Sequence, residues 1–248
     1  MPSLTLTLFL SFAGLSSAVA QNHAQTAAPA PRTCHASSTA AAPTVVELYT
    51  SEGCSSCPPA DRWLSTLKGQ PGVLALAFHV NYWDRLGWPD RFATPESTAR
   101  QWELARQAGS PQVYTPQVLV QGRDWRVWPK LPGPAAASPV ALTLTREGDT
   151  VSAEVTSAAQ APARLAGYWA VLEDGHSSAV RAGENAGSTL RHDHVVRLYK
   201  PVPPWVAAQG SRAQLSVSRG DPAFPRRVVF VVTDAVTAKP LQALALGC

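Results

Sequence analysis

The chain has 248 residues, of which 45% are hydrophobic and 15% are charged. This length and composition exclude a disordered chain and allow one large domain or two of ordinary size. The formal net charge of +4 is small, and the Lys and Arg residues are scattered, so we expect no nucleic-acid partner.

The N-terminal segment predicts export. An apolar run over residues 4–15 precedes Ala18-Val19-Ala20, which is typical of signal-peptide cleavage before Gln21. The residues before the run carry no Lys or Arg, which is unusual for a signal peptide. The run is shorter than the roughly 20 residues of a membrane span, so an anchor is the weaker interpretation. We expect a signal peptide over 1–20, a periplasmic or secreted protein, and no membrane span after cleavage.

The next part of the chain alternates strand and helix patterns. Residues 21–43 are rich in Ala, Thr, Ser and Pro and predict a flexible leader. The following elements are strands over 44–49, 73–80 and 116–121, a helix after Cys57, and a helix over 95–108 with Thr94 as its N-cap. Such alternation predicts an α/β domain over 44–123 with a largely parallel sheet.

The second half has only strand patterns. Residues 124–139 contain four prolines and predict a connector between domains. Beyond it, 140–145 and 151–156 flank a turn and predict a hairpin. Further strands are expected over 165–172, 195–199, 214–218 and 227–233. We therefore predict a smaller all-β, sandwich-like domain over 140–248.

Four cysteines, Cys34, Cys54, Cys57 and Cys248, allow three fully paired connectivities. Cys54 and Cys57 are close enough in sequence to pair with each other. Cys34 and Cys248 would then form a structural disulfide that spans nearly the whole mature chain. The alternative is that Cys34 is a resolving thiol on a mobile tail.

The Cys54-Ser55-Ser56-Cys57 motif is the main candidate site. A structural zinc site needs a second ligand pair, and only His192-Asp193-His194 offers one in alternate strand positions. A strand that leads into a C-x-x-C motif and then a helix favours redox chemistry, because the helix dipole stabilises thiolate. We predict Cys54 as the nucleophile and Cys57 as the resolving thiol. Pro58-Pro59 places the helix start near Cys57, which weakens the dipole at Cys54.

Several spaced blocks carry a resemblance to known proteins. They are ELYTSEGCSSCPPAD at 47–61, HVNYWD at 79–84, YTPQ at 114–117 and GENAG at 183–187. The chain resembles a secreted domain-of-unknown-function family with a thioredoxin-like N-terminal half. The resemblance implies an exported protein with a thioredoxin-like fold, in which a cis Thr115-Pro116 bond faces the cysteines. It implies no reaction, and residues 123–139 are too proline-rich for the helix that usually closes a thioredoxin-like domain.

Polar and aromatic residues after the predicted strands border the motif. Glu52 lies two residues before Cys54. It could accept a proton, raise the pKa of Cys54 by like-charge repulsion, or be a solvated loop carboxylate. The other candidates lie near strand ends or in an aromatic loop over residues 81–92, and they are His79, Trp83, Asp84, Trp88, Thr115 and Pro116. His79 could transfer a proton or be structural, and the two tryptophans could line a peptide groove or simply pack.

The sequence thus predicts thiol-disulfide exchange on protein or peptide thiols, with a redox partner, no cofactor and no metal. Pro116 would shape the substrate contact. The direction of exchange is open. One alternative is a non-catalytic binding module with a structural Cys54–Cys57 disulfide. The other is a copper-binding protein that uses both cysteines and His79.

Overall fold

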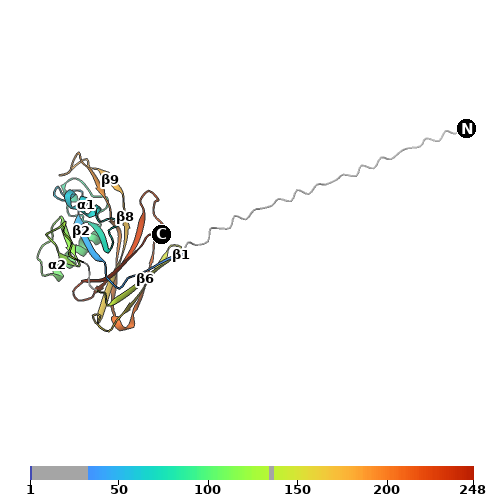
Figure 1. Ribbon diagram of the computed structural model, residues 1–248. Helices are drawn as coiled ribbons and strands as arrows, with labels where there is room; N and C mark the ends of the chain where they lie inside the picture. The colour runs from blue at the N-terminus through green and yellow to red at the C-terminus, as the bar shows by residue number, and fades with distance from the viewer. Residues whose placement is uncertain (2–32, 134–136) are drawn as a thin grey trace. The chain divides into compact units, whose positions relative to one another are not determined.

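The structure is a computed structural model that describes Met1 and residues 33–133 and 137–248 (Figure 1). Every element below belongs to one compact unit, Pro31–Cys248. Apart from Met1, the predicted signal peptide lies outside the described residues. Among the helices of the described part, none is long and apolar enough to cross a membrane.

The predicted α/β, thioredoxin-like fold class is wrong, because the described chain is mostly β. It contains fourteen strands and only two α-helices, α1 (Pro58–Ser65) and α2 (Pro95–Gln107). Two short 3-10 helices, η1 (Asp84–Leu86) and η2 (Ala207–Gln209), lie in connections. A local alternation of strand and helix patterns contains no information about the later strands that join the same sheet.

An eight-stranded sheet forms the centre of the fold. Its order is β14-β13-β8-β11-β3-β2-β4-β5. The strands are β2 (Thr44–Thr50), β3 (Val73–His79), β4 (Gln117–Val120), β5 (Arg123–Asp124), β8 (Arg164–Glu173), β11 (Val195–Val206), β13 (Arg226–Asp234) and β14 (Pro240–Leu246). Strands from both sides of the predicted 124–139 connector therefore share one sheet.

The strands from the two halves of the chain meet in this sheet through a short contact between β11 and β3. Strand β11 pairs with β3 in parallel at Val195 and Ala77, while it pairs with β8 in antiparallel fashion along most of its length. The backbone N–H of Ala77 also donates to the carbonyl of His194, at 2.8 Å. Strands β2 and β3 are parallel, but β4 is antiparallel to β2. The expected largely parallel sheet is thus mostly antiparallel.

Two smaller sheets complete the fold. The four-stranded sheet has the order β1-β6-β7-β12, and β9 and β10 form a hairpin. Their bounds are β1 (Thr33–Ser37), β6 (Val140–Glu147), β7 (Thr150–Ser157), β9 (His176–Ala179), β10 (Thr189–His192) and β12 (Ser211–Ser216). Residues 33–37 of the expected flexible leader are therefore ordered, because β1 pairs with β6 along all five of its residues.

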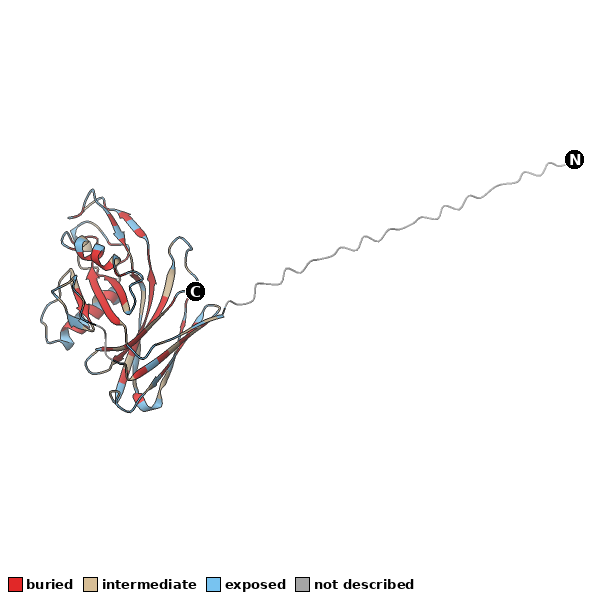
Figure 2. Cartoon of the chain, in the orientation of Figure 1, coloured by how far each residue is buried: buried red, intermediate tan, exposed pale blue. Residues whose placement is uncertain are grey.

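The central strands are covered on both faces, and Figure 2 shows buried residues concentrated on them. Along β8, Trp169 and Val171 pack in a core with β6 and β7. The neighbouring Tyr168 and Ala170 face the opposite way, into a core with Leu104 of α2. Side chains alternate between the faces of a strand, so a continuous apolar run fits a sheet that is buried on both sides.

The two helices follow from local sequence. Helix α2 begins as predicted, because the Thr94 side chain accepts a hydrogen bond from the Ser97 N–H at 3.1 Å and Pro95 occupies the first turn. Helix α1 packs Ala60 and Leu64 against Leu48 of β2. These contacts fix the position of the turn between β2 and α1.

Candidate functional site

Cys54 and Cys57 form a disulfide between the end of β2 and the start of α1. Cys57 is the N-cap of α1 and Pro58 occupies the first turn, where a helix needs no backbone N–H donor, so the proline pair fits without distortion. Both cysteine side chains are 0% exposed, although Ser55 and Ser56 between them are exposed. The Sγ atom of Cys54 lies 3.5 Å from the Oγ atom of Ser56.

The other two cysteines also pair. Cys34 in β1 is joined to Cys248, which follows β14. All four cysteines of the chain are therefore in disulfides. Cys34 lies in a paired strand, which does not fit a resolving thiol on a mobile tail.

Asp61 is the buried carboxyl group of helix α1. Its backbone N–H donates to the Cys57 carbonyl at 3.2 Å, and its Oδ2 atom accepts a hydrogen bond from the Thr50 hydroxyl at 3.1 Å. Burial raises the pKa of Asp61 above its ordinary value, although nearby His192 and His79 oppose this. Asp61 also lines a cleft of about 130 Å³, together with Pro58, Arg62 and residues 189–191. The Asp61 carboxyl group thus contacts buried Thr50 and also borders this cleft.

Glu52 is fully buried and turns away from the disulfide. The Trp88 indole N–H donates to its Oε2 atom at 2.8 Å, and its Oε1 atom lies 3.2 Å from Nε2 of His192. Burial alone would raise the pKa of Glu52, but its contacts with His192 and Trp88 outweigh burial and lower it. Glu52 is thus a buried carboxylate with partners, not the solvated group that one interpretation expected.

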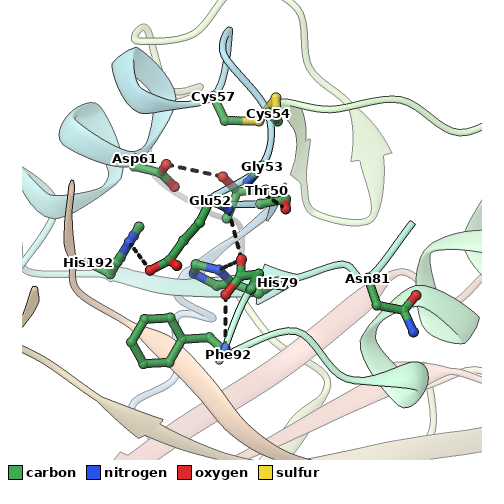
Figure 3. Close-up of polar contacts among 12 residues, drawn as sticks. Thr50, Glu52, Gly53, Cys54, Cys57, Asp61, His79, Asn81, Phe92 and His192 are labelled. Carbon is green, nitrogen blue, oxygen red and sulfur yellow. Dashed lines mark hydrogen bonds and ion pairs between the residues drawn. A yellow bond between two sulfur atoms is a disulfide. The ribbon is translucent and has the colours of Figure 1, made fainter. Parts of the chain in front are cut away.

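His79, at the end of β3, forms a buried ion pair with Asp90. The two side chains are 2.7 Å apart, from Nδ1 to Oδ2. Burial would lower the pKa of His79, but the charge of Asp90 raises it above the ordinary value. The pKa of Asp90 falls to about 2, because the attraction of His79 outweighs burial. Figure 3 shows Asp61, Glu52, His79 and His192 on one side of the disulfide.

Several of the residues predicted to border the cysteine motif contact one another through the aromatic loop. The Trp83 indole N–H donates to the Thr115 hydroxyl at 2.8 Å, and the Thr115-Pro116 bond is cis, as expected. The Asp84 carboxylate accepts a hydrogen bond from the backbone N–H of Asp90 at 3.0 Å. A Cβ atom on Gly53 would lie only 3.0 Å from Cβ of Trp83, so the loop packs directly against the motif.

A hairpin from the second half of the chain covers the motif. We call residues 176–192, which comprise β9, β10 and the loop between them, the cover hairpin. The side-chain amide of Asn185 donates to the carbonyls of Glu52 and Cys54, both at 2.9 Å. The Glu184 carboxylate accepts a hydrogen bond from the backbone N–H of Ser55 at 3.0 Å. Gly183 has a φ of 74° and lies against Trp88, where a side chain would be crowded.

The structure thus brings the predicted residues around one site, but sequence reasoning missed several contributors. Asp90 had no signal, because an acidic residue after a proline in a loop is unremarkable. In the sequence, Asn185 stands out only as part of the GENAG block, and His192 only beside His194 as a possible zinc ligand pair. His192 contacts Glu52, whereas His194 contacts Asp174 and Arg227. Within the described residues, no group of three His, Cys, Asp or Glu side chains is arranged to hold a metal ion.

Fold and site together define a mostly β protein with a buried C-x-x-C disulfide beneath a β-hairpin. The chain belongs to the family described as "Protein of unknown function (DUF1223)", whose model matches residues 45–233. No curated protein matches it.

Two solved structures have a similar fold. A crystal structure of a protein from Agrobacterium tumefaciens has 24% sequence identity and a TM-score of 0.62, and the match covers 84% of this chain and 96% of that one. HBP35 of Porphyromonas gingivalis has 15% identity and a TM-score of 0.57, with coverage of 84% and 76%. At these identities the likeness establishes the fold alone.

Proposed function

We propose that this protein is an exported thiol-disulfide exchange protein that acts on protein or peptide thiols through Cys54 and Cys57. The observation that carries the proposal is a disulfide between residues only three positions apart, at the start of a helix. Chain entropy gives such a short loop about 2 kcal/mol of stabilisation, against about 5 kcal/mol for a loop the size of that closed by Cys34 and Cys248. Structural stabilisation is therefore a weak reason for the Cys54–Cys57 bond.

An oxidising compartment suits this chemistry. Stable disulfides form in the periplasm or outside the cell and are rare in the cytosol. All four cysteines are paired, which supports a periplasmic or secreted location, in line with the N-terminal sequence. The proposed partners are a protein or peptide thiol and a second redox protein that resets the pair.

The exchange has two steps. In the reductive direction, a partner thiolate attacks Sγ of Cys54, a mixed disulfide forms, and Cys57 leaves as a thiolate that takes a proton. A second partner thiolate then attacks the mixed disulfide, so the partner becomes oxidised and the protein holds two thiols. The oxidative direction reverses these steps. Because Cys57 is the N-cap of α1, the helix dipole stabilises its thiolate and makes it the better leaving group.

Asp61 is our candidate for the proton transfer. It lies in the first turn of α1, one turn beyond Cys57, and it lines the cleft that leads to solvent. A carboxyl group whose pKa is raised by burial holds its proton closer to neutral pH, where it can be passed to a leaving thiolate.

One observation favours a second function. Both cysteine side chains are completely buried, which fits a structural disulfide in a binding module. In that case no partner thiol would reach Cys54.

The reduction potential of Cys54–Cys57 and trapping of a mixed disulfide separate these functions. A Cys57→Ala variant should retain a peptide or protein thiol partner on Cys54, since the resolving thiol is missing. The matched Cys54→Ala variant should trap far less, and Asp61→Asn should slow the exchange without preventing trapping. A pair that stays oxidised below about −300 mV and traps nothing would support the binding module instead.

A further inference from the structure

The cover hairpin makes an unusual set of contacts with the cysteine motif. Its bonds go to backbone atoms: Asn185 donates to the carbonyl of Cys54, and Glu184 accepts from the N–H of Ser55. These two backbone groups belong to the same peptide unit. Adjacent side chains of the hairpin therefore clamp the peptide plane that follows Cys54.

The hairpin is organised to present these side chains. Within its loop, the N–H of Gly187 donates to the Val180 carbonyl, and the N–H of Ser188 donates to the Asn185 carbonyl. Gly183 and Gly187 have positive φ values of 74° and 84°, a conformation that favours glycine. Asn185 is buried although its loop neighbours are mostly exposed. A buried amide in an otherwise exposed loop indicates a specific contact and not general packing.

The clamp also bears on access to sulfur. Cys54 and Cys57 are both 0% exposed, so a partner thiolate cannot reach Cys54 while the surrounding elements keep this arrangement. The disulfide closes a ring that contains the clamped peptide unit, and reduction opens that ring and frees the peptide to rotate. The clamp and the disulfide therefore restrict the same part of the backbone.

We propose that the cover hairpin is a redox-linked latch, in which Asn185 holds the motif closed while Cys54 and Cys57 are oxidised and releases it when they are reduced. The proposal concerns regulation of the exchange site and rests on the proposed function. Coupling between two events is reciprocal, so a latch that binds the oxidised motif better must also favour the disulfide. Loss of the latch should make reduction both faster and more favourable.

The test is reduction of the full-length oxidised protein by excess dithiothreitol. Two dithiothreitol thiolates reduce the pair in succession, so each turnover yields one oxidised dithiothreitol and two protein thiols. Thiol labelling and mass spectrometry of the 54–57 peptide give the rate, and redox buffers give the equilibrium. Asn185→Ala should be reduced about tenfold faster, and a tenfold shift of the equilibrium corresponds to about 30 mV towards easier reduction.

Gln242→Ala is the matched control. Gln242 is a buried amide on β14 that likewise donates to two backbone carbonyls, those of Thr39 and Val140. The Gln242→Ala substitution should lower the free energy of unfolding and leave the reduction rate and the reduction potential of the Cys54–Cys57 pair unchanged. Equal acceleration in this variant would show that general loosening is responsible, and the latch would be rejected.

Glu184→Ala is a second test variant, which keeps the experiment informative if the Asn185→Ala variant fails to fold. Glu184 is exposed, so the variant should fold, and loss of its bond to Ser55 should accelerate reduction about threefold. Wild-type rate and potential in both hairpin variants would overturn the latch. That result differs from failure of the proposed function, which would appear in the wild-type protein as a very low potential and no mixed disulfide.

Discussion

Asp90 accepts three hydrogen bonds in the buried part of the site. Its Oδ2 atom accepts from the backbone N–H of Glu52 at 2.8 Å and from the His79 ring at 2.7 Å. Its Oδ1 atom accepts from the N–H of Phe92 at 2.9 Å. One carboxylate thus links the end of β3 and the aromatic loop to the backbone of Glu52, two residues before Cys54.

The stability provided by the His79–Asp90 ion pair depends on pH both in the acidic range, where Asp90 titrates, and at higher pH, where His79 titrates. The pKa of Asp90 is about 2 in the folded protein, below the ordinary value of about 3.9. Its contribution, about 2 to 3 kcal/mol, is present above pH 4 and is lost as the pH falls through about 2. The pKa of His79 is raised, so its contribution is present below about pH 6.5 and is lost as the pH rises through the folded value.

We predict that Asp90→Asn lowers the free energy of unfolding by about 3 kcal/mol at pH 6, because it leaves the buried His79 without a counterion. The difference from the wild type should shrink as the pH falls through about 2, because Asp90 then becomes protonated in the folded protein as well as in the unfolded chain. Denaturant unfolding without reductant measures this. Asp124→Asn, at a partly exposed carboxylate, is the control and should cost less than about 1 kcal/mol. A pH-independent difference would contradict the ion pair.

Gly167 shows how tightly the central strands pack. It lies on β8 opposite Val232 of β13. A Cβ atom added there would lie 2.9 Å from the Val231 carbonyl and 3.0 Å from the Phe230 ring. The backbone of β13 cannot move away easily, because β14 pairs with its other edge.

We therefore expect Gly167→Ala to destabilise the protein by about 1 to 3 kcal/mol through overpacking. Gly133→Ala is a suitable control, since a Cβ atom there meets no atom of the described residues within 4 Å. It should change the free energy of unfolding by less than about 0.5 kcal/mol. Thermal unfolding under non-reducing conditions compares the two, and equal midpoints would show that the sheet adjusts more freely than the packing indicates.

Individual elements were predictable where the signal is local. The strands at 44–50 and 73–79, the helix capped by Thr94 and the 140–157 hairpin agree with the sequence patterns. Pairing between distant strands leaves no local pattern, so the contact of β11 with β3 was not foreseen. The short polar strands β9 and β10 were missed because their sequences, HSSA and TLRH, show no alternation of apolar and polar residues.

The site was predictable to a similar degree. Cys54, Cys57 and their neighbours in sequence were identified from the motif and its place between a strand and a helix. Asp90 and Asn185 act through contacts 38 and 131 positions away in sequence, with Glu52 and Cys54 respectively. Such contacts depend on how the sheet brings the two halves together, and residue types alone do not reveal them.

At the scale of the whole molecule, the Cys34–Cys248 disulfide links the first described strand to the last residue. The two cysteines are 214 positions apart. The chain-entropy model gives a loop of this size about 5 kcal/mol of stabilisation. The bond also holds β1, which pairs with one strand only.

A Cys34→Ser and Cys248→Ser double variant should lose up to about 5 kcal/mol of stability. A Cys54→Ser and Cys57→Ser double variant should lose only about 2 kcal/mol. Denaturant unfolding of both, against the wild type, checks the order. If removal of Cys54–Cys57 proves the more damaging, that disulfide has a structural role and the argument from loop length fails.

The same long-range bond has a mechanical consequence. A pulling force applied between residue 33 and the C-terminus would pass directly from Cys34 to Cys248 through the covalent link. The intervening sheets and the cysteine motif would carry almost none of that load while the bond is intact. Stretched between residue 33 and the C-terminus, the oxidised protein should behave as a short inextensible tether, and the fold would bear force only after the Cys34–Cys248 bond is reduced.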